Sequence, residues 1–243
     1  MNLIIDVGNS FVKLAVFKNS ALINRVDVEL DALLIEVVLL KKKYTLIEKA
    51  IISSVGSLKK KDIKTISEYF DVMVLNSDSK LPFKNFYETP KTLGVDRMAL
   101  VCASIRRFSD KNVLIIDAGT CITYDFVNSK NEYLGGAISP GIQMRYKSLN
   151  SLTAKLPLLD AIKPKEIIGG STKESIHSGV VYGVLHEIDG LIDSYKLKYS
   201  DLTVILTGGD AKFLSKQLKS SIFANPNFLL EGLNFILQFN SDE

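Results

Sequence analysis

The 243-residue sequence predicts an α/β protein built from two similar lobes, and three observations support this prediction. Short apolar runs typical of buried strands alternate with segments of helical periodicity. An apolar strand, an Asp-x-Gly corner and a second apolar strand occur near the start of the chain, as IIDVGNSFVKLAVF, and again near its middle, as LIIDAGTCITYDFV. A further strand, helices and strands follow each copy, so a strand-strand-strand-helix-strand-helix unit is duplicated. The expected lobes are residues 1–109 and 110–243.

The first half is expected to begin with strands at 2–7, 11–17 and 22–28, and Gly8 and Asn9 supply the first turn. Asp31 is expected to cap a helix that runs to about Lys43. The strand KAIISSV, a lysine-rich helix to about Phe70, the strand DVMVLN and a helix from Gly94 to Phe108 follow.

The second half repeats this order. Two strands flank the corner DAGTC, and EYLGGAISPG adds a third strand. A long helix is expected from Thr172 to Lys198, with a capping-box pattern from Ser171 to Glu174. The buried strand LTVILTGGDA ends in a glycine pair, and EGLNFILQF is expected to be the last helix.

The duplicated corner has residues suited to a nucleotide phosphate. Glycine lets bare backbone amides approach phosphate oxygens, and the carboxylate of Asp6 or Asp117 is the kind of ligand that holds hydrated Mg²⁺. Lys13 would add positive charge near the transferred phosphoryl group. A plain β-hairpin explains one such corner equally well. Two copies at half-chain spacing, with a third glycine corner at TGGDA, favour the phosphate interpretation.

Six segments resemble the type III pantothenate kinase family, within the acetate and sugar kinase, Hsp70 and actin superfamily. They are DVGNSFVKLAVF, LGVDRMAL, DAGTCITYDFV, GGAISPG, STKESIHSGVVYG and TGGDA, in the family's order along nearly the whole chain. The resemblance implies two ribonuclease-H-like (actin-like ATPase) lobes around a central nucleotide cleft. Ser10 departs from the family, which usually has threonine there, but it keeps the hydroxyl.

The resemblance also implies the reaction. ATP would give its γ-phosphoryl group to the primary hydroxyl of pantothenate, the first step of coenzyme A biosynthesis, with Mg²⁺ and a monovalent cation (K⁺ or NH₄⁺) as cofactors. Asp6 would hold Mg²⁺ through water. The residues matching the family's ATP contacts are Asp6, Val7, Gly8, Asn9, Ser10, Phe11, Val12, Lys13 and Thr120.

Asp96 matches the family's catalytic base, which would accept the hydroxyl proton late in the transfer. Its alternative role is a helix N-terminal acid favoured by the macrodipole. Arg97 would hold a carboxylate or phosphate, or else form a surface ion pair. The residues matching substrate contacts are Tyr87, Gly94, Val95, Asp96, Arg97 and Thr172. Tyr87 is equally explained by packing and Thr172 by helix capping.

Asp117 matches the position that binds the monovalent cation, although a second magnesium ligand is an open alternative. The family also implies a homodimer, for which the apolar stripe of the helix 172–198 is a candidate contact. Core packing explains that stripe equally well.

Composition excludes several other classes. The net charge of +3 is too balanced for a nucleic-acid or anionic-membrane protein, and the lysine clusters at 41–43 and 59–61 are expected to be solvated. Two cysteines form no disulfide framework or zinc motif, and no apolar run reaches the length of a membrane helix. A cytoplasmic protein is therefore expected.

Three rival functions remain open at this point. Another small-alcohol kinase of the superfamily would keep both corners but has no need of LGVDR. A non-catalytic transcription accessory factor would have no need to keep Asp6, Asp96 and Asp117 together. A protein-binding ATP switch like actin would need extra subdomains, for which this chain is too short.

Overall fold

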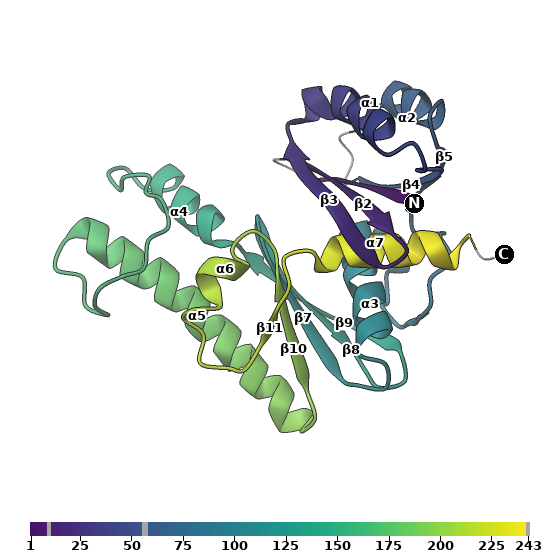
Figure 1. The fold of residues 1–243 in the computed structure, drawn as a ribbon. Helices are drawn as coiled ribbons and strands as arrows, with labels where there is room; N and C mark the ends of the chain where they lie inside the picture. Colours follow the sequence, from purple (N-terminus) through teal and green to yellow (C-terminus); the bar gives the residue numbers. More distant parts are fainter. Residues whose placement is uncertain (9–10, 55–57, 242–243) are drawn as a thin grey trace. The chain divides into compact units, whose positions relative to one another are not determined.

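The computed structural model describes residues 1–8, 11–54 and 58–241, and the chain divides into two compact units (Figure 1). Unit 1 comprises Met1–Ser109, Asn131–Tyr133 and Asn227–Glu243, and unit 2 comprises Asp110–Lys130 and Leu134–Pro226. The chain first passes from unit 1 to unit 2 between Ser109 and Asp110, and the C-terminal segment returns to unit 1. The assignment of residues 110–243 to one C-terminal lobe stays a prediction.

Unit 1 contains a five-stranded sheet in the order β3-β2-β1-β4-β5. The first three strands are antiparallel neighbours, whereas β4 and β5 run parallel to β1. The strands are β1 Asn2–Val7, β2 Val12–Lys18, β3 Ala21–Val28, β4 Lys49–Ser54 and β5 Asp71–Val74. The helices are α1 Leu33–Lys43, α2 Lys60–Ser67, α3 Val95–Arg107 and α7 Phe228–Phe239, with short 3-10 turns η1 Leu30–Ala32 and η2 Pro90–Thr92.

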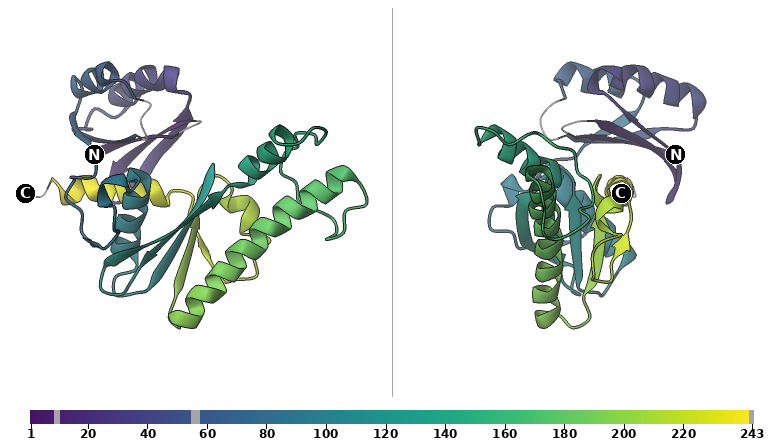
Figure 2. Two further views of the ribbon diagram at one scale, coloured as in Figure 1. Left: turned by 180° about the vertical axis from the view of Figure 1, so that it is seen from behind. Right: turned by 90° about the vertical axis from the view of Figure 1, so that its left-hand side faces the viewer.

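Alternation along the strands divides unit 1 into layers. Ile5, Leu14 and Ile52 point to the face packed against α1 and α2, where they form an apolar core with Leu33 and Val37. The opposite face lies against α7, as the right-hand view of Figure 2 shows. On that face the side-chain amide of Asn2 donates to the side-chain oxygen of Asn234 on α7, at 2.9 Å. Helices therefore cover both faces of the sheet.

Unit 2 contains the second corner, on a sheet ordered β11-β10-β7-β8-β9. β7 and β8 are antiparallel, and β10 and β11 run parallel to β7. The elements are β7 Val113–Ala118, β8 Cys121–Val127, β9 Glu132–Pro140, α4 Ile142–Ser151, α5 Thr172–Lys198, β10 Thr203–Thr207, α6 Ala211–Leu214 and β11 Phe223–Ala224. The long helix α5 packs along one sheet face through Val181, Val184 and Ile188 (Figures 1 and 2). The short strand β6 Lys84–Asn85 pairs with the first two residues of β9, which belong to unit 1.

Two details of the sequence prediction are wrong. Asp31 does not cap α1, because Leu30–Ala32 forms a 3-10 turn and the helix begins at Leu33, with Ala32 at the cap position. The strand DVMVLN ends at Val74, two residues early. The sequence pattern also does not predict α4, in which only Ile142 and Tyr146 are buried. Two apolar positions four residues apart are too weak a signal for a helix.

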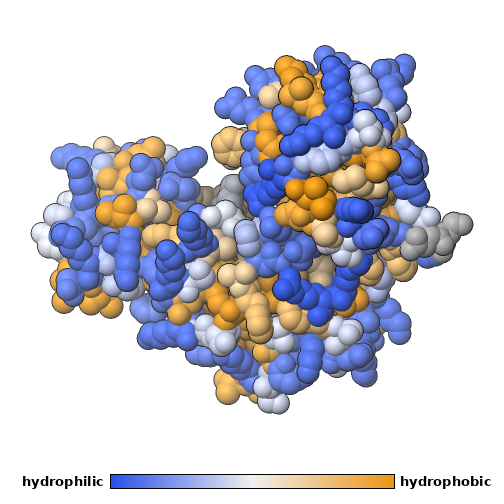
Figure 3. Space-filling view, viewed as in Figure 1, coloured by the Kyte–Doolittle hydropathy of each residue, from blue (hydrophilic) through white to orange (hydrophobic). Residues whose placement is uncertain are grey.

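The lysine clusters lie on the outer surface, as the sequence predicts. Lys42, Lys43 and the cluster at 59–61 are exposed, and so are Ile35 and Leu39 on α1. The space-filling view shows small apolar patches separated by hydrophilic side chains (Figure 3).

Because α3 and α7 pack closely at Gly232, we expect Gly232→Ala to destabilise the protein. An added Cβ would lie 1.9 Å from the Ala99 carbonyl oxygen, so the helices must separate. We expect a loss of about 1–3 kcal/mol in the free energy of unfolding, measured by urea denaturation.

Gly190→Ala on the exposed side of α5 is the matched control. An added Cβ there meets no heavy atom within 4 Å. The alanine should raise stability by about 0.4–1 kcal/mol, because it restricts the unfolded chain. Equal effects of the two substitutions would contradict this account of the α3–α7 contact.

Candidate functional site

The first corner places Asp6 in a row of polar side chains that crosses four strands of unit 1. Asp6 on β1 is paired with Lys13 on β2 and with Ser53 on β4, and Lys13 is paired with Asp27 on β3. Side chains at paired positions point to the same face of a sheet. The row therefore lies on the face that bears Asn2, opposite the core formed with α1 and α2.

The Asp6 carboxylate is buried with little compensation. The residue is 6% exposed, and burial raises the pKa of Asp6 above its usual value. Lys13 acts in the opposite direction, with its Nζ atom 3.5 Å from Asp6 Oδ2, while the charge of Asp96 raises this pKa further. Because burial outweighs the attraction of Lys13, the fold holds a carboxylate that an added cation would stabilise.

The remainder of the first corner offers mainly backbone groups. The Gly8 amide donates to the Phe11 carbonyl oxygen at 3.1 Å and closes the hairpin. The side chains of Val7 and Val12 are buried in the core, so only their backbone atoms are available to a ligand. Two predicted contacts lie outside the described residues, Asn9 and Ser10.

Asp96 occupies the first turn of α3. It is close enough to Asp6 for its negative charge to raise the pKa of Asp6. Its Oδ1 atom accepts a hydrogen bond from the Arg97 amide at 2.9 Å. Gly94 leaves room for this carboxylate, since a Cβ on Gly94 would lie 2.3 Å from Asp96 Oδ1. One oxygen of the Asp96 carboxylate is therefore held by its neighbours in LGVDR, and none of the described residues forms a hydrogen bond with the other oxygen.

Arg97 is buried, so the alternative of a surface ion pair is wrong. Its guanidinium carbon lies 5.5 Å from the ring centre of Tyr87 and 6.0 Å from that of Tyr133. The two rings lie 6.0 Å apart. Cation–π contacts of this kind help to orient a guanidinium. Tyr133 was not predicted as a site residue, because its approach to Arg97 depends on the pairing of β6 with β9.

The second corner places Asp117 in a corresponding row in unit 2. Asp117 on β7 is paired with Thr123 on β8 and with Thr207 on β10. Gly208 has φ +95°, and a Cβ there would lie 2.4 Å from Asp117 Oδ1. Only glycine allows the backbone to pass so close to this carboxylate. Thr120 is exposed at the turn between β7 and β8.

The turn between β9 and α4 supports the second corner. The Gly141 amide donates to the Thr120 carbonyl oxygen at 3.1 Å, and a Cβ on Gly141 would lie 2.1 Å from the Gly119 carbonyl oxygen. Arg145 Nε donates to the Pro140 carbonyl oxygen at 2.9 Å. The Arg145 guanidinium also pairs with Glu187 on α5. The corner thus connects through α4 to α5.

Glu187 is the centre of this connection. Its carboxylate also accepts hydrogen bonds from the hydroxyls of Tyr124 at 2.8 Å and Ser139 at 2.5 Å. Burial acts to raise the pKa of Glu187, but hydrogen bonds from Arg145, Ser139 and Tyr124 hold it below its usual value. Each partner comes from a different element, so this group fixes β8, β9 and α4 on α5.

Thr172 begins α5 and lines a cavity of about 640 Å³ on unit 2. Ser171 Oγ accepts from the Glu174 amide at 3.3 Å, while the Glu174 carboxylate accepts from the Gly170 amide at 2.9 Å. The Ser171 half of the predicted capping box is confirmed. The remaining lining is largely apolar, from Leu149, Leu156, Ile176 and Val180.

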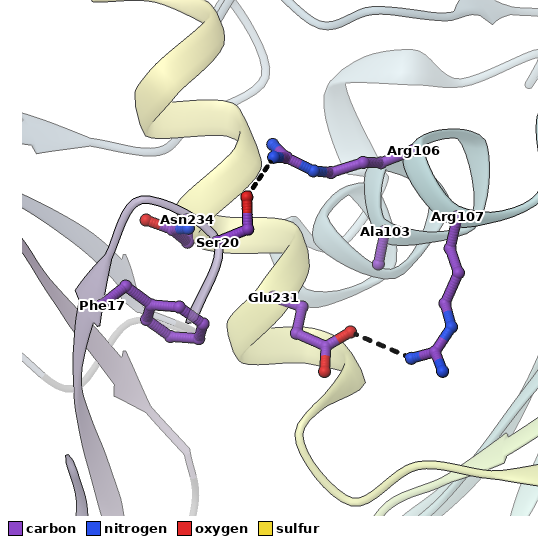
Figure 4. Close-up of a pocket in the computed structure, with 7 residues that line it drawn as sticks. All are labelled: Phe17, Ser20, Ala103, Arg106, Arg107, Glu231 and Asn234. Atoms are coloured by element: carbon purple, nitrogen blue, oxygen red, sulfur yellow. Dashed lines mark hydrogen bonds and ion pairs between the residues drawn. The ribbon is translucent and has the colours of Figure 1, made fainter. Parts of the chain in front are cut away.

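A smaller cavity, of about 210 Å³, lies at the other end of α3 from Asp96 (Figure 4). Its two guanidinium groups already have partners. Arg106 donates to the Ser20 hydroxyl and to the Gln238 side chain, and Arg107 pairs with Glu231 at 3.5 Å. We assign it no role in the candidate site.

The donors present fit a hydrated divalent cation better than a fully protein-bound metal. Among the described residues, no three His, Cys, Asp or Glu side chains cluster closely enough to hold a metal ion. Mg²⁺ typically binds one or two carboxylates and keeps several waters. The buried carboxylate of Asp6 is a donor of that kind. In the described part of the chain, no helix is long and apolar enough to span a membrane.

Known proteins similar to this chain include pantothenate kinases along its full length. The sequence model of the type III pantothenate kinase family matches residues 2–194. A type III pantothenate kinase of Christiangramia forsetii is 50% identical over 243 residues, covering 100% of both chains. One of Flavobacterium johnsoniae is 45% identical over 242 residues, covering 100% of this chain and 99% of its own.

Solved structures share the fold. A Campylobacter jejuni protein described as a Baf family transcriptional activator has a TM-score of 0.65 and 22% identity, covering 99% of this chain and 100% of its own. A glucokinase from an Antarctic psychrotroph has a TM-score of 0.54 and 12% identity, covering 98% of each chain. At such identities the likeness shows the fold alone, which is that of the two-lobed, ribonuclease-H-like sugar kinases.

The raised pKa of Asp6 predicts that Asp6→Asn stabilises the protein at neutral pH. The fold favours the protonated form of Asp6, because burial opposes its ionisation. The stability that protonated Asp6 contributes is therefore full below the ordinary aspartate pKa of about 3.9, and it is lost as the pH rises through the pKa of Asp6 in the folded protein. Urea denaturation should give the variant the larger free energy of unfolding at pH 7, and this difference from the native protein should narrow as the pH is lowered towards 4.

Asp27→Asn should act in the opposite direction. Hydrogen bonds from Arg25, at 2.9 and 2.8 Å, hold the pKa of Asp27 below its usual value. The ionised Asp27 therefore adds stability above the ordinary aspartate pKa, and this is lost as pH falls through the folded pKa. If Asp6→Asn is less stable than Asp27→Asn at pH 7, the conclusion that the fold opposes ionisation of Asp6 is wrong.

Proposed function

The chain belongs to the type III pantothenate kinase family, and from this premise we propose which residues carry out its reaction. That reaction transfers the γ-phosphoryl group of ATP to the primary hydroxyl of pantothenate and yields 4′-phosphopantothenate and ADP. The observation that carries our assignment is the pair of neighbouring acids in unit 1, Asp6 at the end of β1 and Asp96 at the start of α3.

Asp96 acts as the base. Its first oxygen accepts a hydrogen bond from the Arg97 amide, which leaves the second oxygen for the hydroxyl of pantothenate. As the bond from the pantothenate oxygen to the γ-phosphorus forms, the bond to the β–γ bridging oxygen breaks and the hydroxyl proton passes to Asp96. A carboxylate suffices for this because the proton becomes acidic only as charge leaves the hydroxyl oxygen.

Asp6 and Lys13 bind the phosphate end of ATP together with the backbone of residues 7–12. Asp6 binds the hydration shell of Mg²⁺, which offsets phosphate charge when bound. Lys13 is 38% exposed and only loosely paired with Asp6, so it is available to a phosphate oxygen. Thr120 contributes the second ATP contact, at the exposed turn of the second corner.

Arg97 and Tyr87 bind pantothenate, together with the backbone of Gly94 and Val95. The aromatic contacts of Arg97 fix the plane of its guanidinium, which suits recognition of the pantothenate carboxylate. Thr172 is a further candidate contact, on the cavity at the start of α5.

Asp117 binds the monovalent cation. It is supported by the Gly208 backbone, and the carbonyl oxygens of Ala118 and Gly119 follow it in the chain. Carboxylate and carbonyl oxygens are the ligands that hard cations take. The homodimer and the cytoplasmic location stay predictions.

One assay tests the reaction. Purified protein with ATP and Mg²⁺ should release ADP only when pantothenate is present, and mass spectrometry should detect 4′-phosphopantothenate. K⁺ or NH₄⁺ should raise the rate relative to Na⁺. ADP release that depends on a different alcohol would identify another small-molecule kinase, and no turnover with any acceptor would favour a non-catalytic role.

Asp96→Asn should lower kcat by about 10²- to 10⁴-fold, because the amide cannot accept the hydroxyl proton. Binding of ATP and Mg²⁺, measured by calorimetry, should persist, and the thermal midpoint should change little. Full activity in this variant would remove Asp96 as the base.

Gly94→Ala is the companion variant, since it keeps Asp96 but displaces its carboxylate. The new Cβ would lie 2.3 Å from Asp96 Oδ1, a side-chain atom that can move away without disturbing the backbone. We expect kcat to fall by about tenfold or more with stability nearly unchanged, because transfer depends on the position of the base. An unchanged kcat would show that this position is not critical.

A further inference from the structure

Ser53, near the end of β4, carries a buried hydroxyl that the fold does not use. The residue is fully buried, and its Oγ atom has no hydrogen-bond partner among the described residues. Leaving a buried hydroxyl unpaired costs about 1–3 kcal/mol, and buried polar groups in proteins rarely lack a partner. This position therefore calls for a partner from outside the chain.

The hydroxyl faces Asp6. β1 and β4 are parallel, and their register pairs Asp6 with Ser53. Ser53 is close enough to act against the burial of Asp6 and lower its pKa, although no full hydrogen bond joins the two side chains. The nearest cationic group to the Asp6 carboxylate is Lys13, whose Nζ atom lies 3.5 Å from Asp6 Oδ2. Any interaction between these two buried polar groups, Asp6 and Ser53, is therefore weaker than a full hydrogen bond, and it leaves the Ser53 hydroxyl short of a partner.

We propose that the Ser53 hydroxyl binds the water shell of the divalent cation at Asp6. This inference rests on the proposed function, which places hydrated Mg²⁺ at Asp6. A bound water needs two to four polar partners, and Asp6 and Ser53 supply two from adjacent strands. Outer-shell partners of this kind typically change metal affinity by about 10- to 100-fold. Ser53 is then a positioning residue for the cation rather than a base or a nucleophile.

Ser54 is a matched control provided by the chain. Its Oγ atom is also buried and has no partner among the described residues. Its register partner, however, is Val7, which points into the core formed with α1 and α2. The hydroxyls of both serines are therefore buried and without a hydrogen bond among the described residues, although the Ser54 residue is only half-buried, and only Ser53 faces a carboxylate.

Calorimetry with a non-hydrolysable ATP analogue tests the proposal without turnover. The measured quantity is the ratio of the analogue's Kd in EDTA to its Kd in Mg²⁺. Ser53→Ala should lower this ratio by about tenfold and leave the Kd in EDTA unchanged. Ser54→Ala should leave both unchanged. Neither variant should be less stable than the native protein, because each removes an unpaired buried hydroxyl.

Equal ratios for Ser53→Ala, Ser54→Ala and the native protein would overturn the proposal, as would a native ratio of one. If Ser53→Ala loses its cooperative unfolding transition, Ser53→Cys replaces it, since the thiol keeps most of the volume but bonds water weakly. The proposed function is tested separately by phosphorylation of pantothenate. A native protein that binds the analogue more tightly with Mg²⁺ but phosphorylates no pantothenate would disprove that function and leave the Ser53 result standing.

Discussion

The burial of the Asp6 carboxylate is the constraint on which the candidate site depends. Asp6 is one residue from the end of the central strand of its sheet, with Lys13 at 3.5 Å and Asp96 close enough to act against it. A fold selected only for stability would remove this acid or close it with hydrogen bonds. In the function we propose, a hydrated cation and a phosphate would complete its surroundings. Buried acids with raised pKa values are concentrated at functional sites.

Close backbone approaches keep the acids in place. Gly94 leaves the space that the Asp96 carboxylate occupies, and Gly208 lets the chain pass beside Asp117. At Gly141 the constraint is between backbones, since the turn before α4 rests on the carbonyl oxygens of the second corner. A side chain at any of these three glycines would collide with a carboxylate or carbonyl oxygen of the corners or of Asp96. The glycines therefore position the acids as well as turning the chain.

The two corners share a topology but differ in their neighbours. In the first, Asp6 lies between Lys13 and Ser53, whereas in the second Asp117 lies between Thr123 and Thr207. The first acid therefore has a cationic neighbour in the sheet, whereas the paired neighbours of the second are neutral hydroxyl side chains. One duplicated topology therefore carries two different sets of neighbouring side chains.

The sequence by itself determined the two corners, the long helix α5 and most strands, because apolar periodicity and glycine turns are local signals. It also placed Asp96 in the first turn of α3. Tertiary structure alone decided that Arg97 is buried against Tyr87 and Tyr133, and that Ser53 faces Asp6. Those contacts join residues far apart in the chain. Their existence depends on strand register and helix packing, which no local pattern of residues specifies.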